Sequence, residues 1–418
     1  MNNFESNPKL GYYRVGDQTF YSKPTAYLYA TETGQTPEWI FNPIELAKFN
    51  WTEEPTVGLQ ELYRLRALQL REQYDWIRVE SSGGGDSTTA IFSFLLNGIH
   101  LDEVVFRYPE KFDKDLTNDP FNTNPDNTLS ERQFAAEPLL DWIKTHYPKV
   151  KVTIHDYSEN ILEETYMKDE SWIFTTRDWF QPGHGIKHTN FGTREHKLIA
   201  DSGKKICALY GIDKPKVCLI DNKWYVYYLD LQVNHACPIV GEYSNITSEL
   251  FYWTPDMPEL VAKQAHMIKN WFDMPQNQYL RHLVSGVRSG AAQRTSYEWV
   301  VKSIIYPDYD LQTWQTSKPT NSFYNEMDHW FHVNLAKTPY YNVWESGIKY
   351  IVDKIDPKFL EFQLNRAVGL ICNSSSLYYL GDSKTPTQRP AFVNHGHIDQ
   401  LKNNYVAVEN KKIKKIVI

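Results

Sequence analysis

The residues best suited to chemistry stand in one short run, Ser81 to Thr89, with the sequence SSGGGDSTT. Three successive glycines let a backbone approach an anion closely, and hydroxyl side chains add hydrogen-bond donors. The run lies between an expected strand at 76–79 and an expected helix that includes 90–96. In open α/β sheets ligands bind at such junctions, because the N-terminus of the helix offers free N–H groups and a positive dipole end. The run therefore predicts a phosphate site.

Other phosphate-binding motifs do not fit the chain. No Gly-x-x-x-x-Gly-Lys-Ser/Thr sequence occurs in it, so the site is not a Walker A loop. The three glycines also fail to satisfy the dinucleotide pattern Gly-x-Gly-x-x-Gly. A structural turn, with Asp86 or Ser87 capping the following helix, is the alternative interpretation.

Strands and helices alternate on both sides of this run. A hairpin is expected over 11–30, an amphipathic helix over 57–73, and a helix that opens at 128–131 and continues to 143. Further strands are expected at 103–108, 150–155, 205–210 and 224–229. Such alternation indicates an α/β fold with a mainly parallel, doubly wound sheet. Beyond about residue 241 we expect a predominantly helical region, without clear strands before the tail.

The loop from Ser82 to Ser87 (SGGGDS) resembles the Ser-Gly-Gly-x-Asp-Ser loop of the PP-loop, or N-type, ATP pyrophosphatase superfamily. This superfamily includes the C-terminal domain of asparagine synthetase, the adenylyl-sulfate reductases, and tRNA-modifying thiolases and lysidine synthetases. The resemblance covers roughly 74–240. It implies a Rossmann-like fold of the adenine nucleotide alpha hydrolase type, which cleaves ATP between the α and β phosphates and transfers AMP to a substrate.

The resemblance also implies roles for individual residues. Asp86 would hold the pyrophosphate through Mg²⁺, a cation that favours one or two carboxylates plus phosphate oxygens. In a second loop, Asp213 would lie near the metal and Lys214 on a phosphate, although Gly and Pro could equally make this segment a plain turn. The residues expected to bind the nucleotide are Ser82, Gly83, Gly84, Gly85, Asp86, Ser87 and Thr88 in the loop, Phe106 and Tyr108 near the adenine, and Gly211 in the second loop.

A third segment, 181–197, is rich in glycine and basic residues. Lys187 and Arg194 could stabilise the charge that develops in adenylyl transfer, and we expect them to take part in catalysis with Asp86 and Lys214. An ordinary surface loop is the alternative. The three histidines of this segment follow no ligand spacing that supports a zinc site.

Composition limits the class of protein. The chain has 418 residues, a formal net charge of −7 and four cysteines, with no Cys-x-x-Cys pair. This slightly acidic balance argues against broad nucleic-acid binding, and the cysteine spacing argues against zinc ribbons and thioredoxin-type motifs. The start lacks the pattern of a signal peptide, and no apolar stretch is long enough for a membrane span, so we expect a cytoplasmic protein.

Three regions follow from these patterns: 1–70 with the hairpin and first helix, 71–240 with the nucleotide-binding α/β domain, and 241–418 as an aromatic-rich substrate region. The leading hypothesis is an AMP-forming, ATP- and Mg²⁺-dependent enzyme that activates a small-molecule acceptor for amide or amine ligation. Asn2 stands where asparagine synthetase has its catalytic cysteine, so a glutaminase activity is not expected, and Cys372 does not match the reductase motif. The alternatives are nucleobase or tRNA modification, with RNA as a partner, and an ATP-binding module without turnover.

Overall fold

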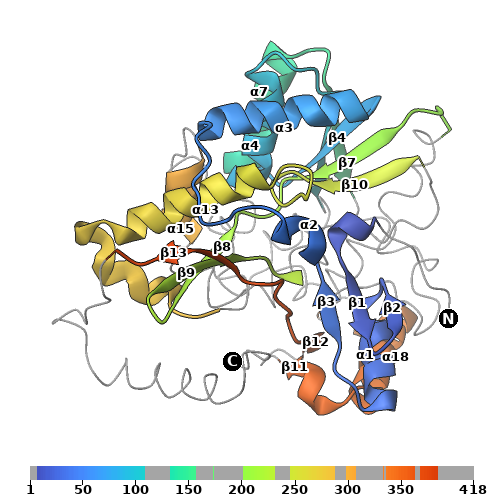
Figure 1. Cartoon of the computed structure of the whole chain (residues 1–418). Coiled ribbons are helices and arrows are strands. Elements are labelled where there is room, and N and C mark those ends of the chain that lie inside the picture. The colour runs from blue at the N-terminus through green and yellow to red at the C-terminus, as the bar shows by residue number, and fades with distance from the viewer. Residues whose placement is uncertain are drawn as a thin grey trace.

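Five parallel strands form the largest sheet of the computed structural model (Figure 1), which describes residues 7–108, 132–156, 173, 201–230, 245–287, 298–306, 333, 336–362 and 368–384. The strands, in their order across the sheet, are β10 (Ile246–Leu250), β7 (Ile206–Tyr210), β4 (Trp76–Ser81), β5 (Glu103–Tyr108) and β6 (Lys151–Asp156). Every neighbouring pair is parallel. The expected parallel α/β sheet is therefore confirmed.

The inner strands are formed by apolar runs. All five residues of β7, with the sequence ICALY, are buried, as is typical of a parallel strand covered on both faces. The strand over 103–108 has the predicted bounds, and β4 and β7 begin and end within two residues of the predicted ones. These runs are readable from sequence because both faces of each strand need apolar side chains.

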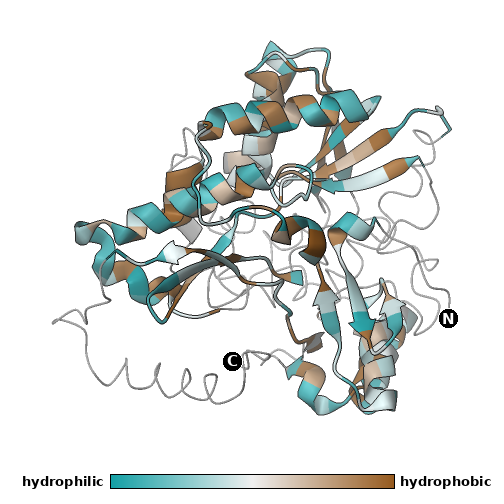
Figure 2. Cartoon of the chain, in the orientation of Figure 1, coloured by the Kyte–Doolittle hydropathy of each residue, from teal (hydrophilic) through white to brown (hydrophobic). Residues whose placement is uncertain are grey.

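Helices α3 (Leu59–Gln73), α4 (Gly85–Leu95) and α7 (Glu137–His146) contact the sheet. In α3 the buried residues recur at helical spacing, and Figure 2 shows hydrophobic and hydrophilic residues alternating along it. Helix α4 ends before Gly98, whose φ of 69° is a left-handed conformation that suits a helix end. A short π-helical turn (Arg132–Ala136) leads into α7, and the start expected at 128–131 lies outside the described residues.

The N-terminal part forms a small sheet with its own helices. Strands β1 (Tyr12–Val15) and β2 (Gln18–Phe20) make a hairpin, and β3 (Glu38–Ile40) pairs with β1 on the other side. The expected hairpin over 11–30 is too long, because α1 (Lys23–Thr33) begins where Ser22 caps the helix. The remaining short elements of this part are a 3-10 turn (Pro8–Leu10) and α2 (Pro43–Ala47).

A third sheet is antiparallel, with the order β13-β9-β8. Strands β8 (Lys216–Ile220) and β9 (Lys223–Tyr227) are joined by Asp221 and Asn222, which both have positive φ, as two-residue hairpin turns require. Strand β13 (Tyr378–Asp382) pairs with β9. The strand expected at 224–229 exists as β9, but it belongs to this sheet and not to the parallel one.

Strands also occur beyond residue 241, so the expectation of none before the tail is wrong. They are β10 in the parallel sheet, β13, and the pair β11 (Leu360–Phe362) and β12 (Val368–Leu370). The described helical elements of this part are α13 (Pro258–Asp273), a 3-10 segment (Pro275–Val284), α15 (Glu298–Ile305), α18 (Pro339–Lys354) and a 3-10 turn (Pro357–Phe359). Within the described ranges no helix is long and apolar enough to cross a membrane.

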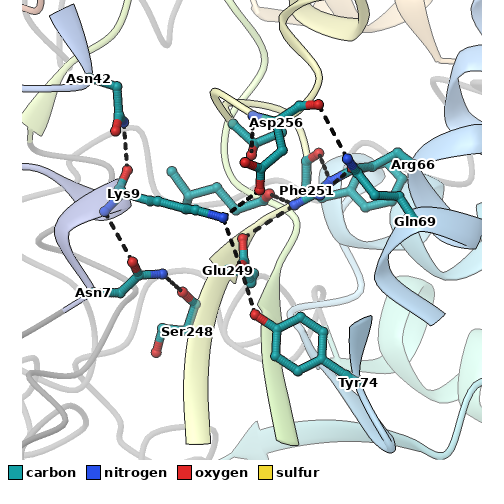
Figure 3. A network of polar contacts seen from close by, with 12 residues as sticks. Asn7, Lys9, Asn42, Arg66, Gln69, Tyr74, Ser248, Glu249, Phe251 and Asp256 are labelled. Atoms are coloured by element: carbon teal, nitrogen blue, oxygen red, sulfur yellow. Dashed lines mark hydrogen bonds and ion pairs between the residues drawn. The ribbon is translucent and has the colours of Figure 1, made fainter. Parts of the chain in front are cut away.

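Strand β10 is joined to α3 by buried polar contacts, and the side chain of Asn7 donates to the carbonyl of Ser248 at 2.9 Å (Figure 3). Arg66 donates to the carbonyls of Leu250 and Phe251 at 2.9 and 3.2 Å and pairs with Glu249 at 3.4 Å. The hydroxyl of Tyr74 donates to the same glutamate at 2.7 Å. These contacts compensate the charge of a carboxylate buried in an edge strand, which would be strongly unfavourable without a partner.

Asp230, which follows β9, joins the N-terminal part to the C-terminal one. Its buried carboxylate accepts from the Tyr13 hydroxyl at 2.8 Å and from the backbone and side-chain N–H groups of Asn373 at 2.9 and 2.7 Å. The ammonium of Lys23, itself 1% exposed, lies 2.8 Å from the same carboxylate. The pair is thus fully removed from water and depends on its mutual neutralisation.

Replacing Asp230 by alanine should therefore destabilise the fold strongly, because the buried ammonium of Lys23 would lose the carboxylate that lies 2.8 Å from it. The expected loss in the free energy of unfolding is about 3–5 kcal/mol, measured by urea denaturation. Glu38→Ala, which removes the exposed pair with Arg14, is the control and should cost less than about 1 kcal/mol. Equal losses in the two variants would contradict this account of the buried pair.

Candidate functional site

Two loops meet at the carboxyl edge of the parallel sheet. The first follows β4 and the second follows β7, and these neighbouring strands are level, with Glu80 opposite Tyr210. From β4 the chain continues to β5 on one side of the sheet, whereas from β7 it continues to β10 on the other. This is the point where the strand order reverses, and such points hold the ligand crevice of open α/β sheets.

Hydroxyl groups organise the loop after β4. The Ser87 hydroxyl accepts from the N–H of Ser82 at 3.3 Å and donates to the carbonyl of Gly84 at 3.2 Å. The N–H of Gly83 donates to the Ser81 hydroxyl at 3.2 Å, and that of Gly84 to the Ser82 hydroxyl at 3.3 Å. The serines predicted to hold phosphate thus also shape the loop, through bonds long enough to be exchanged for a ligand.

The glycines of the site serve different purposes. Gly83 has a φ of 74°, and a Cβ there would lie 2.7 Å from the backbone nitrogen of Ala136. At Gly211 a Cβ would lie 2.7 Å from the Cα of Ser87, so the two loops touch only because this residue lacks a side chain. Gly84, by contrast, has an ordinary φ and would meet only the Ser82 hydroxyl, at 3.3 Å. Its missing side chain leaves room in front of the loop.

Helix α4 begins at Gly85, so its first turn contains Asp86 and Thr88. The first N–H groups of a helix have no partner within the helix and carry its positive dipole end. The Thr88 side-chain oxygen is buried and has no hydrogen-bond partner among the described residues. A buried hydroxyl of this kind normally finds a partner, which a bound anion would supply.

Asp86 receives donors from three distant segments. Its carboxylate lies 3.4 Å from the ammonium of Lys214 and 3.5 Å from that of Lys302, and it accepts from the hydroxyl of Tyr306. The Tyr252 hydroxyl holds the backbone carbonyl of Asp86 at 2.7 Å. Burial and the neighbouring Asp86 raise the pKa of Tyr306, so that its hydroxyl stays protonated and able to donate.

Asp213 holds the lysines of the second loop. Its carboxylate is 6% exposed and lies 2.8 Å from the ammonium of Lys214 and 2.6 Å from that of Lys216. Burial disfavours the charged carboxylate, but the two lysines outweigh it and hold the pKa of Asp213 well below its usual range. Asp213 is therefore charged and paired with both lysines. Its role as a metal ligand stays a prediction, which these contacts do not favour.

The charges of the site add up to an excess of positive charge. Among the described residues, two carboxylates, Asp86 and Asp213, face three ammonium groups, those of Lys214, Lys216 and Lys302. The dipole of α4 adds to this excess. Together with the open space at Gly84 and the unpaired hydroxyl of Thr88, this charge fits a polyphosphate.

Mg²⁺ would have one carboxylate here. The side chain of Asp86 is 21% exposed, and a single carboxylate with phosphate oxygens and water is a normal set of ligands for Mg²⁺. In the described part of the chain no group of three His, Cys, Asp or Glu residues could hold a metal by itself. Among the described residues of the site, Asp86 is thus the carboxylate that could contribute to a Mg²⁺ site.

The remaining predicted residues divide into two groups. Phe106 is buried on β5 directly opposite Ser81, which places it beside the loop, and Tyr108 ends the same strand. Arg107, between them, is held by Glu80 through two bonds of 3.0 and 3.1 Å. Lys187 and Arg194 lie outside the described residues, so their expected catalytic role stays a prediction.

Sequence reasoning missed three contributors, Lys302, Tyr306 and Tyr252. None stands in a motif, and Lys302 is the single basic residue of a mostly apolar helix, a pattern that occurs on many helices. No protein-family model, curated protein or solved structure matches this chain. The resemblance to the PP-loop superfamily therefore stays a prediction from the loop residues.

A side chain at Gly211 should push the two loops apart. In Gly211→Ala the new methyl would meet backbone atoms of Ser87 and Asp86, which cannot move aside as a flexible side chain would. We expect a loss of about 1–3 kcal/mol in unfolding free energy, as for overpacked cores. Gly58→Ala, where nothing lies within 4 Å of the new methyl, is the control and should leave stability nearly unchanged. An unaltered denaturation midpoint in Gly211→Ala would contradict the close approach.

Proposed function

We propose that this protein is an adenylating enzyme that binds ATP with Mg²⁺ at the junction of the β4 and β7 loops and forms AMP and pyrophosphate. The observation that carries the proposal is the meeting of Asp86 with Lys214, 3.4 Å apart, from two loops at the switch point of a parallel sheet. The SGGGDS sequence and the excess of positive charge support it. A turn with a purely structural role would need neither this loop sequence nor the excess of positive charge.

The chain's own residues would act by position and charge. The first N–H groups of α4, the loop hydroxyls and Lys214 would hold the β and γ phosphates, with Asp213 keeping Lys214 and Lys216 in place. Asp86 would hold Mg²⁺, which neutralises charge on the phosphates. Charge that builds up on the leaving pyrophosphate would be stabilised by these fixed donors, the dominant means of catalysis in such reactions.

The bond changes that we propose are those that the resemblance implies. An acceptor oxygen attacks the α phosphorus, the bond from that phosphorus to the bridging oxygen of the β phosphate breaks, and pyrophosphate leaves with the electron pair. The acceptor is then an adenylate. A nitrogen nucleophile displaces AMP from it and forms the amide or amine, with loss of one proton. A small-molecule carboxylate is the acceptor we propose, and a nucleobase in RNA is the alternative to be tested.

Asp86→Asn should abolish this reaction, and thermal unfolding verifies that the variant is folded. The amide keeps the shape of the side chain but removes the charge that would hold Mg²⁺, so we expect AMP formation to fall about 100-fold or more. The measurement is chromatography of the products of ATP with Mg²⁺, supplied with amino acids and ammonium, or with RNA. Asp256→Asn is the matched control, since Asp256 is also a partly exposed aspartate paired with a lysine.

The products decide between the alternatives. AMP and pyrophosphate, lost in Asp86→Asn and kept in Asp256→Asn, would support the proposal, and the stimulating mixture would identify the acceptor class. ADP and phosphate would contradict the bond cleavage. Tight ATP binding without turnover in any mixture would favour a binding module.

Gly84→Ala should weaken nucleotide binding without weakening the fold. The new methyl would occupy the space before the loop and meet only the Ser82 hydroxyl, so the backbone need not move. We expect roughly a tenfold rise or more in the Kd for ATP, a change of about 1.4 kcal/mol, measured by calorimetry. Gly58→Ala is a close control, because Gly58 and Gly84 both precede a helix in an extended conformation. Unchanged ATP affinity in Gly84→Ala would place the phosphates elsewhere.

A further inference from the structure

Two side chains from helix α15 and the residue that follows it contact the carboxylate of Asp86, although this helix is not part of the parallel sheet. Its Lys302 lies 3.5 Å from Oδ2 of Asp86, and Tyr306, directly after the helix, donates to Oδ1 of the same carboxylate. The helix is held firmly, because the carbonyl of Ile305 accepts from the Tyr63 hydroxyl of α3 at 2.8 Å. The side chain of Lys302 is only 17% exposed. Its position over the site is therefore fixed by packing and is not a chance surface contact.

The two lysines at Asp86 differ in what else they contact. Lys214 also lies 2.8 Å from Asp213 and would keep this partner if Asp86 were engaged elsewhere. Lys302 has Asp86 as its one carboxylate partner among the described residues. A largely buried ammonium that loses its counter-ion is costly, so it needs another anion close by.

Mg²⁺ bound to the carboxylate of Asp86 would cancel the negative charge that stabilises the ammonium group of Lys302, and the cation would also repel that group. If Asp86 is taken up by the metal, Lys302 is the group left without compensation. The polyphosphate of the nucleotide is the anion that would then face it.

We propose that Lys302 is a charge-exchange residue of the nucleotide site, an inference that rests on the function proposed above. In the ligand-free protein it neutralises Asp86. When Asp86 binds Mg²⁺, Lys302 moves its ion pair to a phosphate oxygen of the nucleotide. This exchange makes the binding of metal and nucleotide cooperative, because Mg²⁺ takes Asp86 from Lys302 and the nucleotide then provides Lys302 with a new anionic partner.

The test compares nucleotide affinity with and without the metal. Calorimetry with α,β-methylene-ATP, which cannot be cleaved at the proposed bond, gives a Kd in Mg²⁺ and a Kd in EDTA, and their ratio measures the coupling. In Lys302→Met we expect the affinity in Mg²⁺ to fall about tenfold or more, while the affinity in EDTA stays within about twofold, so the coupling is lost. Lys302→Arg keeps the charge and should keep the coupling.

Lys263→Met is the matched control, since Lys263 is 16% exposed and pairs with Glu54, away from the site. It should retain the wild-type ratio. Thermal unfolding verifies that each variant is folded, and Lys302→Gln gives the same comparison if Lys302→Met does not fold. If Lys302→Met weakened nucleotide binding equally in Mg²⁺ and in EDTA, or did not weaken it, the proposed exchange would be overturned. Lys302 would then only hold α15 to Asp86. Failure of the wild-type protein to bind the nucleotide at all would overturn the proposed function as well.

Discussion

The carboxylate of Asp86 is the contact on which the arrangement of the site depends. It gathers Lys214 from the loop after β7 and Lys302 and Tyr306 from the region of α15, three groups between 128 and 220 residues away along the chain. One charged side chain at the start of α4 thus joins the parallel sheet to a helix outside it. The close approach of Gly211 to Ser87 makes this possible, because it brings the second loop within reach of the first.

Around this contact, buried charges are consistently paired. Asp213 holds two lysines, Glu249 holds Arg66, and Asp230 holds Lys23. The pairs of Glu249 with Arg66 and of Asp230 with Lys23 join segments far apart in the sequence, whereas Asp213 holds lysines of its own segment. The interior itself is formed by aromatic and aliphatic side chains. Where Asp86 and Asp213 meet, three ammonium groups of the described residues face two carboxylates, and this excess of positive charge favours an anionic ligand.

The parts of the fold that sequence could predict are those encoded in adjacent residues. The apolar runs of β5 and β7 and the glycine loop before α4 each carry their own signal. Strand β10 (ITSEL) does not, because its polar residues are buried only through partners such as Arg66, which lies 183 residues earlier than Glu249. The same limit applies to Lys302. Its position beside Asp86 depends on how α15 packs, and the residues around Lys302 in the sequence do not indicate that packing.

The buried carboxylate of Asp230 has a consequence for how the chain is made. Its donors come from Tyr13 and Lys23 near the beginning and from Asn373, 143 residues further on. During synthesis Tyr13 and Lys23 leave the ribosome long before Asn373. Asp230 therefore lacks the hydrogen bonds from Asn373 until more than a hundred further residues have been added. The N-terminal sheet is therefore fully stabilised only after the C-terminal part has been made, because Asn373 supplies the remaining donors to the buried carboxylate.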